Sequence, residues 1–171
     1  MAVSQFNLTN GKRAERKLLI TVAEWSEGGS SPVREILGTR TEDSSIEYNP
    51  DIETTTDILG INYTDINRTQ PQQDFDPYLV LGGSKLGAFL NDIRSRNALA
   101  ELNQFTVYVI TAFVGSAGSY AAEKHENCTI TYNSMGGDTN VNFPISVYFS
   151  NKITNGTVDK LADDFVFTPA E

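Results

Sequence analysis

Residues 105–114 read Phe-Thr-Val-Tyr-Val-Ile-Thr-Ala-Phe-Val, and they are apolar at both the odd-numbered and the even-numbered positions. Successive side chains of a β-strand point to opposite faces of its sheet. A segment that is apolar in both sets is therefore expected to be covered on both sides. We predict that residues 105–114 form a central strand.

Other segments alternate in a way that predicts further strands around this one. Residues 17–25 predict a first strand with both faces partly covered. Residues 127–132 and 142–150 predict two amphipathic strands, and residues 165–168 a short last one. Together the pattern predicts a mainly β protein, a β-sandwich or barrel with one flanking α-helix and a long hairpin or loop.

The helix is predicted to begin at Ser84, whose side chain can cap the first amides. Apolar residues follow at i, i+3, i+4 and i+7 from Leu86, and basic residues precede Asn97 at the expected end. The preceding residues, 67–83, contain two prolines, two glycines and several glutamines, and are predicted to form a long loop.

The most acidic stretch covers residues 41–67, which contain seven acidic residues and no lysine or arginine. The whole chain of 171 residues has a net charge of −9, so this stretch carries most of the excess. Asn49-Pro50 marks a turn, which predicts a hairpin with its tip there. In the following strand Asp51, Glu53 and Asp57 form an acidic row on one face, while Ile52 and Ile58 are expected to face a core.

The organisation predicted from these segments is one folded domain with two terminal extensions. Residues 1–16 form an N-terminal arm that ends in a basic cluster, residues 17–158 form the β domain, and residues 159–171 form an acidic C-terminal tail. The N-terminus lacks the charged and apolar regions of a secretory signal. No stretch approaches the ~20 apolar residues that span a bilayer, so membrane insertion is not expected.

Composition argues against several kinds of site. One cysteine, Cys128, and one histidine, His125, exclude an intramolecular disulfide and a Cys/His metal site, and no cofactor is expected. Cys128 is expected to be a buried small hydrophobe, and His125 an ordinary surface residue. The acidic surface disfavours nucleic acid as a bound partner, because that affinity comes mainly from Lys and Arg that neutralise phosphates.

Three local patterns could carry chemistry, but each has a stronger structural interpretation. Asp74 and Asp76 are too few for a cation site and suit loop turns. The Gly82-Gly83-Ser84 segment could hold a phosphate at the helix terminus, but it lacks the P-loop lysine and suits helix entry. The acidic row is too exposed and too uniform for paired glycosidase carboxylates. We therefore predict no catalytic residues and no enzyme activity.

A resemblance rests on the run Val-Arg-Glu-Ile-Leu-Gly-Thr-Arg-Thr-Glu-Asp-Ser-Ser-Ile-Glu-Tyr-Asn-Pro-Asp-Ile-Glu-Thr-Thr-Thr-Asp-Ile-Leu-Gly at residues 33–60. Phe-Asp-Pro at 75–77 and Gly-Gly-Ser at 82–84, followed by the short helix, extend it. With these residues, the chain resembles the major tail tube proteins of long non-contractile-tailed bacteriophages. The similarity covers residues 17–150.

The resemblance implies a virion protein, assembled in the host cytoplasm, whose homo-hexameric rings stack into a tube that conducts DNA without binding it specifically. Its neighbours would be the tape measure, terminator and distal tail proteins. The acidic row would either line the lumen, where it repels DNA, or lie at the ring contact. Solvent exposure that protects a sheet edge is a third explanation of the row. Candidates for inter-ring stacking are Lys12, Arg13, Arg16, Lys17, Glu42, Asp43, Glu47, Asp163 and Asp164, and Arg40 is a further possible cation for the row.

Two other functions compete with this one. A surface or carbohydrate-binding β-sandwich module could use Trp25 and the seven tyrosines to stack on sugars. A small hydrolase would need a perturbed carboxylate pair in a cleft, and it is the least favoured because no acid–base arrangement is evident.

Overall fold

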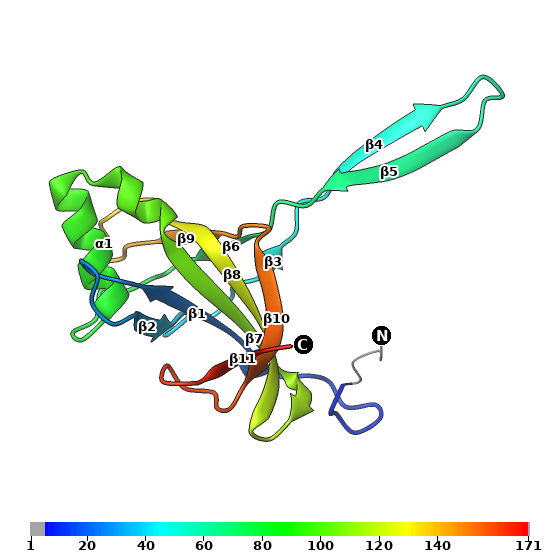
Figure 1. Cartoon of the computed structure of the whole chain (residues 1–171). Helices are drawn as coiled ribbons and strands as arrows, with labels where there is room; N and C mark the ends of the chain where they lie inside the picture. Colours follow the sequence, from blue (N-terminus) through cyan, green and yellow to red (C-terminus); the bar gives the residue numbers. More distant parts are fainter. Residues whose placement is uncertain (1–5, 171) are drawn as a thin grey trace.

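The computed structural model describes residues 6–170, and these residues form a mainly β protein with one α-helix (Figure 1). No helix in this part of the chain is long and apolar enough to span a membrane. The elements in chain order are the 3-10 helix η1 (Arg16–Leu18), β1 (Leu19–Trp25), β2 (Val33–Ile36), β3 (Ile46–Glu47), β4 (Asp51–Thr56), β5 (Asn62–Arg68), β6 (Gln72–Phe75), α1 (Lys85–Arg96), the 3-10 helix η2 (Leu99–Asn103), β7 (Phe105–Ser116), β8 (Ser119–Tyr132), β9 (Ile145–Tyr148), β10 (Ile153–Val158) and β11 (Phe167–Pro169).

Nine of these strands form one antiparallel sheet in the order β2-β1-β7-β8-β9-β6-β3, with β10 paired to β8 and β11 paired to β10. Strand β8 joins the two halves, because its first half pairs with β10 and its last four residues pair with β9. Between these halves Asn127 has a φ of 60°, and the register with β7 shifts by one residue. Such a bulge bends a strand, and here it lets β8 change partners.

The central strand β7 is covered on both faces, as its sequence predicts. On one face Phe105 and Val107 belong to the larger core cluster, which includes the buried face of α1. On the other face Tyr108 and Ile110 pack with Val158 and the C-terminal segment, in a second cluster. The protein is therefore a sheet with two apolar faces, and residues 158–167 cover the second one.

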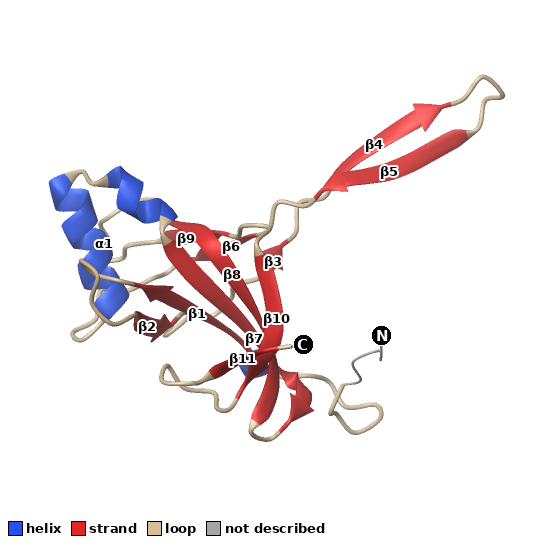
Figure 2. Cartoon of the chain, viewed as in Figure 1, coloured by secondary structure: helices blue, strands red, loops and turns tan. Residues whose placement is uncertain are grey.

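Helix α1 confirms its prediction at both ends. The Ser84 hydroxyl accepts a hydrogen bond from the Gly87 amide at 3.1 Å, and Asn97 takes a left-handed conformation as the C-cap. Leu86, Leu90 and Ile93 are buried against the sheet. Figure 2 shows α1 and η2 together at one end of the sheet, with the β4–β5 hairpin extending away from the body.

Three local predictions were wrong. The tip of the hairpin is at residues 57–61 and not at Asn49-Pro50, which lies in the connection that enters the hairpin. Ile52 and Ile58 face solvent and not a core. The predicted loop at 67–83 contains β6, because Gln73 and Phe75 are buried against the body despite the polar composition around them.

Candidate assembly interface

The β4–β5 hairpin is the most distinctive surface of the protein. It forms a two-stranded sheet of its own, and every residue of both strands is exposed. No residue of the hairpin belongs to either core cluster. An isolated two-stranded hairpin is at best marginally stable in water, so this element has an unusually small share in the stability of the body.

The two faces of the hairpin differ in chemistry. Ile52 lies opposite Ile66, and threonines follow on the same face. On the other face Glu53 lies directly opposite Asp65, and two like charges in that position repel each other. One face therefore offers uncovered apolar groups and the other an uncompensated pair of carboxylates.

The tip is organised by Asp57. Its carboxylate accepts hydrogen bonds from the amides of Leu59 at 2.8 Å and Ile61 at 3.0 Å, and from the Tyr63 hydroxyl at 3.3 Å. These bonds, with that from Ile61 the largest, lower the pKa of Asp57. Next to it Ile58 is fully exposed. Asp57 thus holds the turn and lies outside the row that alternation predicts.

The other two members of the predicted row also have partners within the hairpin. Asp51 lies 3.6 Å from the Arg68 guanidinium in an exposed ion pair at the root. The Asn67 amide donates to Glu53 at 3.2 Å. Exposed pairs of this kind contribute little stability and can be exchanged for contacts with a partner.

The basic stacking candidates occupy the arm and its junction with β1. Lys12 and Arg13 are exposed and form no ion pair among residues 6–170. Lys17 pairs with Glu15 at 2.6 Å. Arg16 instead directs its guanidinium to backbone carbonyls of its own chain.

The acidic stacking candidates lie in two separate places. Glu42 and Asp43 are exposed in the loop before β3, and Glu47 is exposed within β3, close to the root of the hairpin. Asp163 lies 3.5 Å from Lys85. Asp164 pairs with Lys160 at 2.5 Å. These last two acids belong to the segment that covers the second core cluster.

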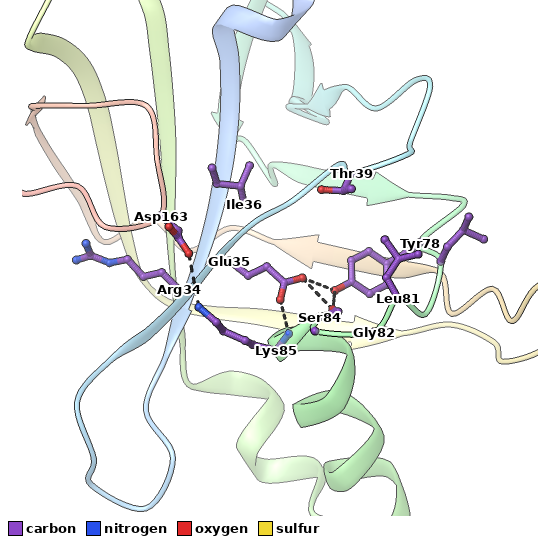
Figure 3. A pocket seen from close by; sticks show the side chains of 12 residues that line it. Arg34, Glu35, Ile36, Thr39, Tyr78, Leu81, Gly82, Ser84, Lys85 and Asp163 are labelled. Atoms are coloured by element: carbon purple, nitrogen blue, oxygen red, sulfur yellow. Dashed lines mark hydrogen bonds and ion pairs between the residues drawn. The ribbon is translucent and has the colours of Figure 1, made fainter.

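A cavity of about 320 Å³ lies beside the start of α1 (Figure 3). The Glu35 carboxylate accepts from the Lys85 amide at 2.6 Å and the Leu86 amide at 3.0 Å. It also accepts from the Tyr78 hydroxyl at 2.9 Å and the Ser84 hydroxyl at 3.0 Å. Burial, with the nearby Glu35 charge, raises the pKa of Tyr78 well above its usual value. Because Glu35 already occupies these amides, the Gly-Gly-Ser segment is a helix entry and not a phosphate site.

The histidine prediction was wrong, because His125 is only 4% exposed, in the middle of β8. Its Nε2 lies 3.3 Å from Glu123 and its Nδ1 lies 3.3 Å from the Ser150 carbonyl oxygen. Cys128 is buried as predicted, and burial raises the pKa of its thiol. A buried thiol of raised pKa is a poor nucleophile. Among the described residues, no group of three or more His, Cys, Asp or Glu could hold a metal ion.

Trp25 is not available to stack on a sugar, since it is only 3% exposed. Its ring stacks on Phe89 with centroids 5.6 Å apart and contacts Phe105. Trp25, one of the aromatic residues that motivated a carbohydrate-binding module, is therefore part of the core.

The apolar content of the hairpin was the feature that the sequence interpretation missed. The sequence did contain a signal for it. Ile58, Leu59 and Ile61 flank Gly60, so three apolar residues lie in a segment whose glycine indicates a turn. In the structure all three apolar side chains at this tip are exposed. Exposed apolar residues that gather at one place mark interaction surfaces more often than those scattered singly.

No family model matches the chain, and no curated protein matches it. Solved structures give similarities of fold. One is a chain of the PVC sheath-tube complex of an extracellular contractile injection system in the extended state, with 12% identity and a TM-score of 0.47 over 87% of this chain and 95% of that chain. Another is in the tube-terminating cap of the anti-feeding prophage, with 13% identity and a TM-score of 0.48 over 92% and 99%. A third is in the 6-fold symmetrised baseplate of the anti-feeding prophage, with 7% identity and a TM-score of 0.47 over 86% and 97%.

Proposed function

We propose that this protein is a structural, non-enzymatic subunit of a long non-contractile phage-type tail tube, in which six copies form a ring and the rings stack around a DNA channel. The observation that carries the proposal is the β4–β5 hairpin, which projects from the body with neither face covered. The residue pattern at 33–60, which includes the first strand of this hairpin, is the same pattern that resembles major tail tube proteins.

In this proposal the hairpin binds to a second copy of the chain in the next ring. Contact between two different surfaces of identical subunits does not close on itself and produces filaments. The acidic face of the hairpin, with Glu53 and Asp65, needs a basic surface, and Lys12, Arg13 and Arg40 are exposed cations of the same chain. Ion pairs between rings would remove the repulsion between the two opposed carboxylates.

The location of the acidic row favours a ring contact over a lumen lining. A row that lines a channel should lie on the face of a sheet packed into the ring wall, whereas Asp51 and Glu53 lie on an element that extends away from the sheet. DNA would pass the net negative surface of the tube without specific binding. In the proposed particle the tube meets the tape measure, terminator and distal tail proteins, and it is assembled in the host cytoplasm.

Electron microscopy of the concentrated protein tests the proposal. Hollow tubes or hexameric rings are expected from the unaltered chain. A variant in which two glycines replace residues 51–68 should keep its body folded, since no hairpin residue enters either core cluster, and should form no tubes. A strictly monomeric protein at all concentrations, or tubes that form equally well without the hairpin, would refute the proposal.

A charge reversal separates the two roles of the acidic row. Glu53→Lys should prevent stacking if the row lies between rings, whereas tubes that form normally but eject DNA poorly would assign the row to the lumen. Asp138→Lys is the matched control, because Asp138 is an exposed acid in the loop before β9, outside the hairpin. Its tubes should be unchanged.

A further inference from the structure

The hairpin is attached to the body through a short and unequal root. Its exit leads into β6, which pairs with β9 along four residues. Its entrance is β3, an edge strand of two residues that pairs only with β6. Between root and hairpin, the Gln70 amide donates to the Tyr48 carbonyl at 2.9 Å. A two-residue edge strand frays easily, so the direction of the hairpin depends on what else holds its entrance.

The segment just before β3 is held by Arg16. The guanidinium donates to the Ser44 carbonyl oxygen twice, from Nη2 at 2.7 Å and from Nε at 3.2 Å. Its third bond, from Nη1, goes to the Leu19 carbonyl oxygen at 2.6 Å. One side chain thereby ties the entrance of the hairpin to the start of β1. Hydrogen bonds from a charged donor are stronger than those between neutral groups.

A buried polar network continues from the same point into the sheet. The Ser44 hydroxyl donates to the Asp74 carbonyl oxygen at 2.7 Å and accepts from the Gln73 amide at 3.1 Å. Gln73 is only 1% exposed, and its side-chain carbonyl oxygen, Oε1, accepts a hydrogen bond from the Thr21 hydroxyl at 2.8 Å. Ser44 is thus fixed from both sides, by Arg16 outside and by Gln73 inside. A fully satisfied buried network specifies one arrangement of the chain.

We propose that Arg16 is a positioning residue for the hairpin: by clamping Ser44 it keeps β3 in register and sets the direction in which β4 and β5 project. The start of the arm is anchored separately on β7, where the Asn7 backbone amide donates to the Phe113 carbonyl oxygen at 3.0 Å, so Arg16 acts on the hairpin entrance alone. The positioning is a property of the single subunit and does not depend on the proposed function.

Distances between spin labels on the monomer test the positioning. Leu59→Cys at the exposed tip and Ser95→Cys on α1 provide the two sites, and buried Cys128 leaves the labelling selective. In this background Arg16→Gln should broaden the tip-to-body distance distribution markedly. Arg16→Lys retains a charged donor but lacks the planar guanidinium that makes three hydrogen bonds to two carbonyl oxygens, so it should give an intermediate width. Arg13→Gln is the matched control and should leave the distribution unchanged.

Hydrogen exchange supplies the second measurement. Loss of the clamp should speed exchange of the β3 amides by about 10-fold, while β7 keeps its protection. Unchanged distances and exchange in Arg16→Gln would overturn the inference, as would a uniform loss of protection throughout the body. Ser44→Ala keeps the carbonyl oxygen that accepts from Arg16 and removes only the hydroxyl, so it should broaden the distribution less than Arg16→Gln. If Arg16→Gln broadens the distances as expected but the unaltered protein forms no tubes, only the proposed function fails. If the unaltered protein forms tubes but Arg16→Gln leaves the distances unchanged, only this inference fails.

Discussion

Replacement of Glu35 by alanine should destabilise the protein through the N-terminus of α1. The carboxylate accepts from the Lys85 and Leu86 amides and from the hydroxyls of Tyr78 and Ser84. Alanine leaves the two amides to water and removes the acceptor of the mostly buried tyrosine, which keeps only its contact with Ser84. The helix cap is worth about 1 kcal/mol, and a buried hydroxyl left without its charged acceptor costs about 1–3 kcal/mol.

The free energy of unfolding should therefore fall by about 3 kcal/mol, which lowers Tm by roughly 6–12 °C for a chain of this size. Urea unfolding followed by circular dichroism measures it, with the slope on denaturant expected to stay constant. Glu42→Ala is the control, because Glu42 is exposed and makes no hydrogen bond or ion pair among the described residues. A difference between the two variants below about 0.5 kcal/mol would refute the role assigned to Glu35.

Three further predictions concern the hairpin and the C-terminal strands. The lowered pKa of Asp57 means that its support of the tip is present above the unfolded pKa of 3.8 and is lost as pH falls through the folded pKa. The protection factors of the tip amides, which correct for the slower intrinsic exchange in acid, should therefore fall as pH drops below 3.8, and Asp57→Ala should lack this protection even at pH 7. Asp65→Lys replaces the repulsion with Glu53 by attraction and should stabilise the hairpin by about 0.5 kcal/mol. The amides of the hairpin should then exchange roughly twofold more slowly, and faster exchange would contradict the cross-strand pairing. Gly156→Ala would place its Cβ against the Thr168 backbone carbonyl oxygen and 2.6 Å from the Phe167 ring. The free energy of unfolding should therefore fall by about 1–3 kcal/mol, and an unchanged Tm would argue against this close approach of β11 to β10.

The sequence was a good guide where a single segment determines its own environment. The double apolar pattern of 105–114 predicted a strand covered on both faces, and the two core clusters confirm it. Ser84 and Asn97 predicted the ends of α1, because caps act on amides and carbonyls within one turn. Each of these features depends only on residues close by in the sequence, so the sequence alone is enough to predict it.

The sequence was a poor guide where burial depends on distant partners. Gln73 lies in a polar stretch, yet it is buried because Thr21 and Ser44, far away in the chain, satisfy its amide. His125 is buried for a similar reason, beside the Ser150 carbonyl. Strand β10 was not predicted at all, since Asn155-Gly156 carries a turn signature. The close approach of the Thr168 backbone carbonyl and the Phe167 ring explains the glycine.

The turn at the hairpin was misplaced because two turn signals compete. Asn49-Pro50 marks a change of direction, but Asn49 has a φ of 42° in the connector and the tip is formed around Gly60, with a φ of 79°. Periodicity alone cannot decide whether Ile52 faces a core or a partner, because both give the same alternation. Of the candidate interface, the sequence therefore predicted the acidic residues and their strand, but not that the face carrying Ile52 is exposed as well.

The separation of the β4–β5 hairpin from both core clusters has a consequence for the evolution of the protein. Substitutions at 51–68 do not alter the packing that folds the body, so this segment can diverge at a rate set by its contacts alone. A change in the hairpin can thus follow a change in the surface that receives it without a loss of fold stability. Related chains should accordingly keep the apolar positions of β1, β7 and β8 while their hairpins differ in length and charge, and a hairpin exchanged between two such chains should transfer its choice of partner with it.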